Sequence, residues 1–299
     1  MKWLLKAAVH QALSALPGGY RINYLLQRHI TRSLPRAWTE IRDKFLIALA
    51  HWRAARDIRG KGPLSAYEFG AGWELVVAMG LYMLGVEVQV LVDRYRLARW
   101  ELVEAAAGQM RRHHAELEEM AGQRLRPLPD CRGQHEALEA LGIYYMAPCD
   151  AACTPLPAGS FHLVSSTQVL EHVPEAELEG IFSECARVVS ENGVVSLWID
   201  MADHYSYFDP AVGPYNFLRY PEGVWRLVNS SLHYQNRLRL GDYLRVASAS
   251  GLRLVGMDLR LPTPKELGEL KRMPLARPFR DRELAEVSVK GAHLVFVRG

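Results

Sequence analysis

Three features are scarce in this sequence, and each scarcity removes a class of protein. The 299 residues include only four cysteines, none in a C-x-x-C pair and none with a histidine spacing that suggests zinc, so no disulfide framework and no metal site are predicted. No apolar run approaches the length of a membrane span. Lys6 and His10 interrupt the apolar residues of the N-terminus, so no signal peptide is predicted. We therefore expect reduced thiols in a cytoplasmic protein.

Net charge is also small, at +3, but it is distributed unevenly. Residues 1–60 hold 11 Lys+Arg and 3 Asp+Glu, whereas the remainder holds 25 and 30. A basic appendage on a mildly acidic body indicates contact with an anionic lipid surface, a phosphate-bearing substrate or RNA, or docking of the appendage onto the body itself. The length and the 49% hydrophobic content suit one large α/β domain with such an appendage.

The appendage, residues 1–60, is predicted to be helical. The pattern indicates helices near 3–13, 20–30 and 37–56, with a break at 17–19. The third helix carries an apolar stripe that is expected to pack on the main domain. The first helix, with its lysines and Trp3, could lie on an anionic membrane, so residues 1–20 are a candidate peripheral contact at the inner membrane face. A lid and a homodimer interface are the alternatives.

The most informative stretch runs from Ala66 to Asp93. A strand ends in the tight turn 70–72, a helix is predicted over 73–84, and a second strand over 86–92 is closed by Asp93. This is the layout of a nucleotide-type cofactor site. Gly70 and Gly72 let the backbone pass close to a ligand. Asp93 stands where a carboxylate can accept both hydroxyls of a ribose.

The details of the turn distinguish between two cofactor classes. A dinucleotide site needs a third glycine where this chain has Leu75. Glu68, two residues before Gly70, resembles motif I of class I S-adenosylmethionine-dependent methyltransferases, although that family usually has a glycine where Glu74 stands. A carboxylate at this position would repel a pyrophosphate but suits an ammonium and a sulfonium. The alternative is an ordinary βαβ turn. The resemblance implies that the cofactor, S-adenosylmethionine, is bound by Glu68, Phe69, Gly70, Ala71, Gly72, Asp93 and Arg94.

Two further motifs are similar to the same family. Asp150 followed by Ala151 resembles the acidic residue that meets the adenine amino group, a role suited to an acceptor-only carboxylate. Gln168 leads into Leu170-Glu171-His172, which resembles the turn beside the cofactor in that family. His172 is therefore a candidate general base, and a helix cap or a cofactor contact is the alternative for it.

The resemblance implies a Rossmann-like α/β fold, mostly parallel with an antiparallel terminal hairpin strand, over residues 61–299. The extension 1–60 would then be a lid, which this class often builds from N-terminal helices. The pattern predicts further helices at 97–124, 177–190 (ended by Asn192-Gly193), 240–250 and 264–271, and strands at 143–146, 161–166, 194–199 and 252–261. The terminal segment is predicted to be a strand pair at 286–290 and 293–298, or one strand interrupted at Gly291.

Residues of about 200–238 form an insertion dense in aromatic, His, Asp and Asn residues. Loops over the carboxyl edge of such a sheet form the substrate pocket, so we expect this insertion to bind substrate. Asp203-His204 is a further general-base candidate, with Asp209 or Asp200 as the alternative partner of the imidazole. An aromatic mini-core with a buried histidine is the other interpretation. The substrate-binding candidates are Tyr205, Tyr207, Tyr215, Asn216, His233, Tyr234 and Arg237.

The sequence therefore predicts an S-adenosylmethionine-dependent methyltransferase that acts on a hydroxyl of a small-molecule or sugar-like (glycan) substrate. His204 is the first candidate for the base and His172 the second, and Arg237 or Arg219 could hold a phosphate or carboxylate of the substrate. The insertion also resembles methyltransferases associated with polysaccharide or natural-product biosynthesis. A membrane-associated lipid or quinone methyltransferase, an RNA methyltransferase and a non-catalytic cofactor-binding protein are the alternatives. No RNA-binding module is recognised, so no nucleic-acid partner is expected.

Overall fold

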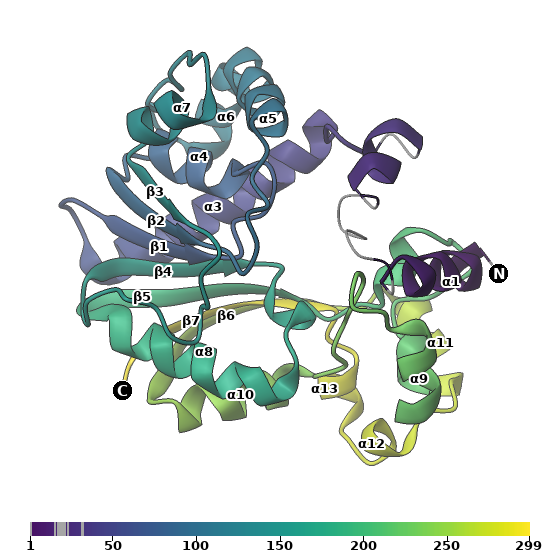
Figure 1. Ribbon diagram of the computed structural model, residues 1–299. Helices are drawn as coiled ribbons and strands as arrows, with labels where there is room; N and C mark the ends of the chain where they lie inside the picture. The colour runs from purple at the N-terminus through teal and green to yellow at the C-terminus, as the bar shows by residue number, and fades with distance from the viewer. Residues whose placement is uncertain (1, 15, 17–21, 23, 31–32) are drawn as a thin grey trace.

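The computed structural model describes residues 2–14, 16, 22, 24–30 and 33–299, built around one seven-stranded sheet (Figure 1). The strand order is β3-β2-β1-β4-β5-β7-β6, parallel except for β7, which is antiparallel to both of its neighbours. The strands are β1 (Ser65–Phe69), β2 (Val88–Val92), β3 (Ile143–Met146), β4 (Phe161–Thr167), β5 (Val189–Asp200), β6 (Leu252–Arg260) and β7 (Gly291–Arg298). The order reverses between β1 and β4, and open sheets bind ligands outside the carboxyl ends of the strands at such a point.

Helices cover both faces of the sheet (Figure 1). One face carries α3 (Trp38–Arg59), α4 (Val76–Met83), α5 (Trp100–Arg112), α6 (His114–Ala121) and α7 (Gln134–Ala140), and the other carries α8 (Glu175–Val188) and α10 (Leu240–Ala249). The remaining elements are α1 (Lys2–Ser14), η1 (Leu26–Ile30), η2 (Leu170–His172), η3 (His204–Tyr207), η4 (Asn216–Arg219), α9 (Glu222–Val228), α11 (Pro264–Arg272), α12 (Arg277–Arg280) and α13 (Leu284–Val287). The central strands are buried along most of their length, as strands covered on both faces must be. The predicted Rossmann-like α/β fold is confirmed.

Helix α3 belongs to the body of the domain. It packs against α4, β4 and β5, and its buried His51 is hydrogen-bonded to the sheet. His51 Nδ1 lies 2.7 Å from Ser196 Oγ on β5, which in turn lies 2.7 Å from Nε2 of His293 on β7. Ile41, Phe45 and Leu49 of the predicted apolar stripe are core, whereas Leu46 is 41% exposed. None of the described helices is long and apolar enough to cross the hydrocarbon layer of a membrane.

Helix α1, by contrast, lies beside α9 of the insertion (Figure 1). The Trp3 ring packs on Tyr205 and Tyr220, at centroid distances of 5.3 and 6.1 Å. The Trp3 backbone N–H donates to the Asp209 carboxylate at 3.2 Å. The predicted break at 17–19 and the start of the second predicted helix at residues 20–21 lie outside the described residues.

Two predicted helices have different bounds in the structure. The helix expected at 73–84 begins only at Val76, because Leu75 adopts φ 54°, in the left-handed region. The helix expected at 97–124 is two helices, since His113 leaves the helical dihedrals at φ −103° and ψ 22°. The His113 ring stacks on Trp38 at 4.0 Å, and α6 then turns to bury Leu117.

Two predictions near the chain's second half are wrong. Asn192-Gly193 does not end a helix: α8 stops at Val188, and the pair lies in an irregular part of β5, where the register against β4 shifts. A Cβ on Gly193 would lie 2.8 Å from the Phe161 carbonyl oxygen, so the close strand approach explains this glycine. Residues 286–290 are not a strand, because α13 occupies 284–287. The antiparallel partners of β7 are β5 and β6.

Candidate active site

The glycine turn after β1 has two different faces. Gly70 and Gly72 both adopt φ 76°, which favours glycine. A Cβ on Gly70 would lie 2.2 Å from Val169 Cγ2, whereas a Cβ on Gly72 would meet no described atom within 4 Å. Gly70 therefore permits packing against the loop after β4, and Gly72 leaves the backbone open to a ligand.

Two buried carboxylates flank this turn. Burial and the neighbouring Asp93 raise the pKa of Glu68 to about 8, and Lys44 partly opposes the shift. Burial raises the pKa of Asp93 to about 7, against the opposing effects of the Tyr145 hydroxyl and the Gly72 and Ala71 amides. The Tyr145 hydroxyl donates to Asp93 Oδ2 at 2.9 Å. Two acidic groups that lose water in this way would gain from a cationic ligand.

The departure at Glu74 from the family pattern has a structural explanation. Glu74 is buried, and its Oε2 lies 3.0 Å from Arg36 Nε and 3.5 Å from Lys44 Nζ. These cations come from α3 and the residues before it, so the N-terminal part of the chain braces the cofactor turn. The sequence reasoning did not find these pairs, which join residues 30 and 38 positions apart.

The other predicted cofactor residues lie at the same edge of the sheet. The Cys149 amide donates to the Asp93 carbonyl at 2.9 Å, which brings Asp150 beside the end of β2. Asp150 is exposed, and its Oδ1 accepts from the Ala152 amide at 2.9 Å. Gln168 is exposed with φ 55°, a conformation that a side-chain residue rarely adopts.

Four predicted cofactor residues contribute differently from the rest. Phe69 is core, and Ala151 packs against the same cluster. Ala71 packs against the helices on the opposite face of the sheet. Arg94 is largely exposed, and its guanidinium pairs with Glu177 at 3.1 Å. Of these residues, Phe69 could meet a ligand only through its backbone, since its side chain is buried.

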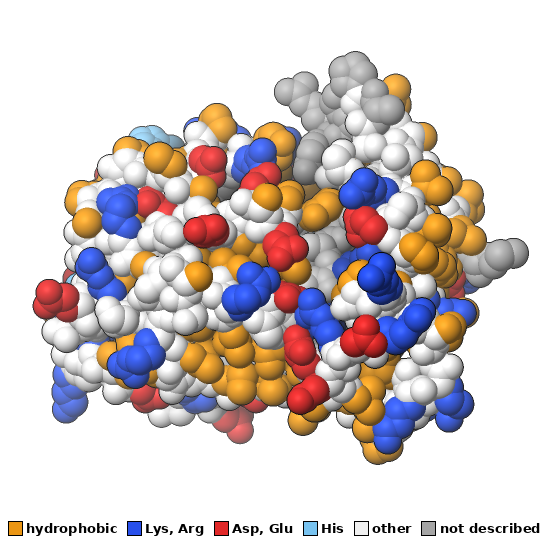
Figure 2. All heavy atoms as spheres, turned by 90° about the horizontal axis from the view of Figure 1, so that it is seen from below, with side chains coloured by type: hydrophobic (Ala, Val, Ile, Leu, Met, Phe, Trp, Pro, Cys, Tyr) orange, Lys and Arg blue, Asp and Glu red, His pale blue; other side chains and the backbone are white. Residues whose placement is uncertain are grey.

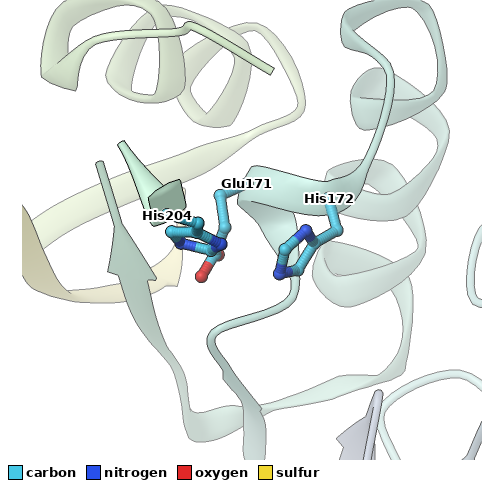
Figure 3. Close-up of side chains that lie close together, drawn as sticks. All are labelled: Glu171, His172 and His204. Atoms are coloured by element: carbon cyan, nitrogen blue, oxygen red, sulfur yellow. The ribbon is translucent and has the colours of Figure 1, made fainter. Parts of the chain in front are cut away.

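Beyond the glycine turn, Glu171, His172 and His204 converge (Figure 3). The first two come from η2 and the third from η3. The ring centroids of the two histidines are 5.0 Å apart. His172 Nδ1 lies 2.6 Å from the Tyr234 carbonyl oxygen, which can only accept, so Nδ1 carries the proton and Nε2 keeps its lone pair.

Burial governs the protonation of this group. Burial and the nearby Asp200 raise the pKa of Glu171 well above its usual range. Burial, with the nearby cations as a secondary cause, lowers the pKa of His204 to about 3. Removal from water also lowers the pKa of His172, opposed by the Tyr234 carbonyl and Asp200. At neutral pH both imidazoles are therefore uncharged and present free lone pairs.

The acidic neighbour of the His204 ring is Asp200, one of the two alternatives to Asp203. His204 Nε2 lies 3.7 Å from Asp200 Oδ2, which also accepts from the Tyr207 hydroxyl at 2.6 Å. Asp203 instead caps η3, accepting from the Tyr205 amide at 2.8 Å and from Asn216 at 3.2 Å. Asp203 and His204 are thus neighbours in sequence, but the Asp203 carboxylate bonds to the Tyr205 amide and the Asn216 side chain, and Asp200 is the acid beside the His204 ring.

Much of the insertion is a small aromatic core. The hydroxyl of buried Tyr205 donates to the Val228 carbonyl at 2.7 Å, and that of buried Tyr215 donates to the Ser288 carbonyl at 2.6 Å. They pack with Phe217 and Trp225. Their hydroxyls are therefore used within the fold, as the mini-core interpretation expected.

The remaining substrate candidates divide into structural and accessible groups. Arg237 is buried, and its guanidinium donates to the Phe217 and Tyr220 carbonyls and to Glu222 at 2.6 Å. Tyr207 is 61% exposed, and Tyr234 is partly exposed beside His172. His233 packs on the His10 ring at 5.1 Å and on His204 at 6.2 Å. The accessible candidates thus surround the His172–His204 pair.

Two site residues that the sequence reasoning left out hold η2 and the start of η3 in place. The Asn236 side chain donates to the Leu170 and Val173 carbonyls at 2.8 and 2.9 Å, and the backbone N–H of Asn236 donates to the Glu171 carbonyl at 2.7 Å. Gln235 accepts from the His204 amide at 3.1 Å. Their place in the polar run after His233 was the available signal.

This chain matches one family model and is similar to several solved structures. Residues 111–197 match the family model of a methyltransferase domain. Curated proteins gave no match. Among solved structures, geranyl diphosphate C-methyltransferase from Streptomyces coelicolor A3(2), with Mg²⁺, geranyl diphosphate and S-adenosyl-L-homocysteine, is 14% identical with a TM-score of 0.45, covering 84% of this chain and 80% of its own.

Two other solved structures are similar at the same level. A TehB-like SAM-dependent methyltransferase from Corynebacterium glutamicum is 12% identical with a TM-score of 0.45 and coverages of 95% and 100%. The YcgJ protein from Bacillus subtilis is 15% identical with a TM-score of 0.43 and coverages of 84% and 97%. The prediction of a methyltransferase domain is confirmed for residues 111–197, which match that family model, and the predicted Rossmann-like sheet is the one observed.

Proposed function

We propose that this protein transfers the methyl group of S-adenosylmethionine to a hydroxyl of a small-molecule or sugar-like substrate. The observation that carries the cofactor part is the pair of buried carboxylates, Glu68 and Asp93, beside an open glycine backbone at the switch point of the sheet. Glu68 suits the cofactor's ammonium and sulfonium, and Asp93 suits its ribose hydroxyls.

The acceptor would approach from the insertion and lose its proton near His172 and His204. The methyl carbon is attacked in line as the bond to sulfur breaks, so orientation supplies much of the acceleration. The sequence ranked His204 first as base, but a group with a pKa of about 3 is a weak base at neutral pH. His172 is oriented by Tyr234 and presents Nε2, so we favour His172.

Calorimetric titration tests the cofactor. Wild-type protein should bind S-adenosylmethionine and S-adenosylhomocysteine at micromolar concentrations, and Asp93→Ala should weaken both. A folded protein that binds neither compound would end the proposal.

A screen of hydroxylated small molecules and sugars, read out as S-adenosylhomocysteine formed, would then identify the acceptor class. With an acceptor in hand, His172→Ala should lower turnover by about 10² or more while cofactor affinity stays unchanged. Equal turnover in wild type and variant would eliminate His172 as base.

We further propose that α1 is a lid over the insertion. Its inner side packs on the insertion through Trp3 and Ala7, and Lys6 Nζ lies 4.6 Å from the centre of the Phe208 ring. Its outer side exposes Leu4, Leu5 and Val9. Trp3→Ala should raise the KM for the acceptor and leave cofactor affinity intact. Flotation of the full chain, but not of a chain lacking residues 1–20, with anionic liposomes would instead assign α1 to a membrane surface.

A further inference from the structure

Glu171 is an unusual charge to bury. Its side chain is 1% exposed, and neither carboxylate oxygen has a hydrogen-bond partner among the described residues. The backbone amides of Asp200 and of Glu171 itself lie near enough only to moderate its pKa. An ionised carboxylate in such a place costs several kcal/mol unless a positive partner neutralises it. The position of Glu171 therefore suits a carboxylate that faces a cation.

Two imidazoles converge on this carboxylate (Figure 3). Glu171, His172 and His204 each offer one ligand atom, and these atoms all lie within 4.8 Å of one another. Atoms that share a metal ion at about 2.1 Å lie roughly 3–3.5 Å apart. To surround an ion, the three ligand atoms would therefore have to move about 1.5 Å closer to one another, a change that side-chain rotation can supply.

The hydrogen bonds around the two imidazoles leave their lone pairs available. His172 donates through Nδ1 to the Tyr234 carbonyl at 2.6 Å, which fixes the tautomer and directs Nε2 as an acceptor. A second-shell bond of this kind is typical of metal-bound histidines. His204 Nε2 has no hydrogen-bond partner among the described residues, and the nearest acid is Asp200 at 3.7 Å.

We propose that Glu171, His172 and His204 together bind one divalent transition-metal ion beside the acceptor position. Two imidazoles and one carboxylate suit Zn²⁺, Mn²⁺, Fe²⁺ or Co²⁺, whereas Mg²⁺ and Ca²⁺ prefer oxygen ligands alone. Three protein ligands leave a position for water or for a substrate oxygen.

The charges around the trio are compatible with one added cation. Arg260 is paired with Asp200, and Lys6 is the other cation that acts on His204. The Asp200 carboxylate accepts from the Tyr207 hydroxyl and the Ala202 amide, so these bonds hold its negative charge beside the His204 ring. A single ion, held mainly by Glu171, is the arrangement that these charges favour.

The role of the ion rests on the proposed function. A substrate hydroxyl at the open position would be more acidic, and its proton would pass to water. The oxygen would then form the O–CH₃ bond while the S–CH₃ bonding pair remains on sulfur, giving S-adenosylhomocysteine. With the ion bound, His172 serves as a ligand, and the metal replaces its imidazole as the group that promotes loss of the proton.

Cobalt titration of the chelator-treated full chain tests the site, because Co²⁺ bound by histidine has visible absorption. We expect one Co²⁺ per chain at micromolar concentrations, with about a 100-fold loss of affinity in Glu171→Gln and in His204→Ala. The matched control is the double variant His113→Ala/His114→Ala. These surface histidines lie 2.9 and 3.6 Å from Glu116 and Glu118 and form the obvious adventitious site, so the double variant should keep the Co²⁺ spectrum.

The inference is overturned if folded wild-type protein binds no Co²⁺, or if Glu171→Gln binds as well as wild type. Circular dichroism and S-adenosylhomocysteine affinity establish that each variant is folded. The cofactor titration separates the two proposals: a protein that binds S-adenosylhomocysteine but no Co²⁺ keeps the proposed function and loses the metal, whereas the reverse result removes the methyltransferase proposal alone.

Discussion

At the scale of single residues, the cofactor turn depends on carboxylates that the fold removes from water. Glu68 and Asp93 both have pKa values raised into the neutral range, mainly by burial. Lys44 stabilises the ionised form of Glu68 only in part. The charge state of this site is therefore set by pH and by whatever positive charge a ligand brings.

Cofactor affinity should consequently depend on pH. Below pH 7 both carboxyls hold protons, and a cationic cofactor favours their ionised forms, so binding releases protons. Affinity should rise from pH 6 to pH 8, by up to about tenfold per unit for each carboxyl that titrates. Calorimetry in two buffers of different ionisation enthalpy measures the protons released.

Asp93→Asn and Glu68→Gln provide the controls for this dependence. Each variant should flatten the part of the pH profile that belongs to the carboxyl it removes. The same affinity at pH 6 and pH 8 in wild type would contradict the assignment of a cationic ligand to this pair.

Tyr145 should matter for both affinity and stability. Its hydroxyl donates to Asp93 and accepts from the Leu97 and Ala98 amides at 3.0 and 3.3 Å. Tyr145→Phe leaves these groups without their partner, so we expect a loss of about 1–3 kcal/mol in unfolding free energy and weaker cofactor binding. Tyr144→Phe is the matched control, because Tyr144 is the preceding residue and is 66% exposed. Equal urea midpoints for the two variants would refute this role.

At the scale of elements, η2 is where the cofactor turn and the insertion meet. Val169, just before η2, packs into the space left by Gly70, and Asn236 holds the turn from the other side. His172 is in turn fixed by the Tyr234 carbonyl. A change in the glycine turn should therefore be transmitted to the histidine pair.

Gly70→Ala and Gly72→Ala form a matched pair, because both residues have φ 76°. The backbone penalty, about 1–2 kcal/mol, is common to both variants. Only Gly70→Ala also overlaps with Val169, so it should unfold at markedly lower urea concentration. Val169→Ala in the Gly70→Ala background should restore part of the loss. Equal destabilisation by the two alanines would show that the contact with Val169 is unimportant.

The sequence predicted local features of these elements better than their long-range partners. The strand–turn–helix order around Gly70 and the class of fold follow from periodicity and glycine placement. The trio of Glu171, His172 and His204 joins η2 to η3 across 32 residues, and no spacing rule reports that proximity. The predicted helix end at Asn192-Gly193 was wrong for a related reason: Gly193 is required by the close approach of the neighbouring strand at Phe161.

At the scale of the whole molecule, one buried arginine joins three parts of the chain. Arg239 is fully buried, and its guanidinium donates to the Met201 carbonyl at 2.7 Å, to Val287 at 2.8 Å and to Val289. It thereby connects the end of β5, the start of α10 and the segment before β7. Arg239 is buried away from solvent, whereas the surface seen in Figure 2 carries acidic and basic side chains interspersed with hydrophobic ones.

Arg239→Met should destabilise the whole domain. The substitution leaves buried carbonyls of Met201, Val287 and Val289 without a donor, at a cost of about 3–5 kcal/mol. Chemical denaturation should show the loss in a single transition. Arg253→Met on exposed β6 is the control and should change stability by less than about 0.5 kcal/mol. A near-wild-type midpoint for Arg239→Met would refute this role.

The contact between His51, Ser196 and His293 has a consequence for biosynthesis. Ser196 follows His51 by 145 residues, and His293 follows Ser196 by 97. Helix α3 leaves the ribosome early, and its Ile41, Phe45 and Leu49 can pack on α4 soon afterwards. The strands that meet its His51 face are made much later, and closing such distant contacts is slow. We therefore expect this face to stay uncovered until β5 and β7 emerge, so that chaperones which shield apolar helices bind the nascent chain.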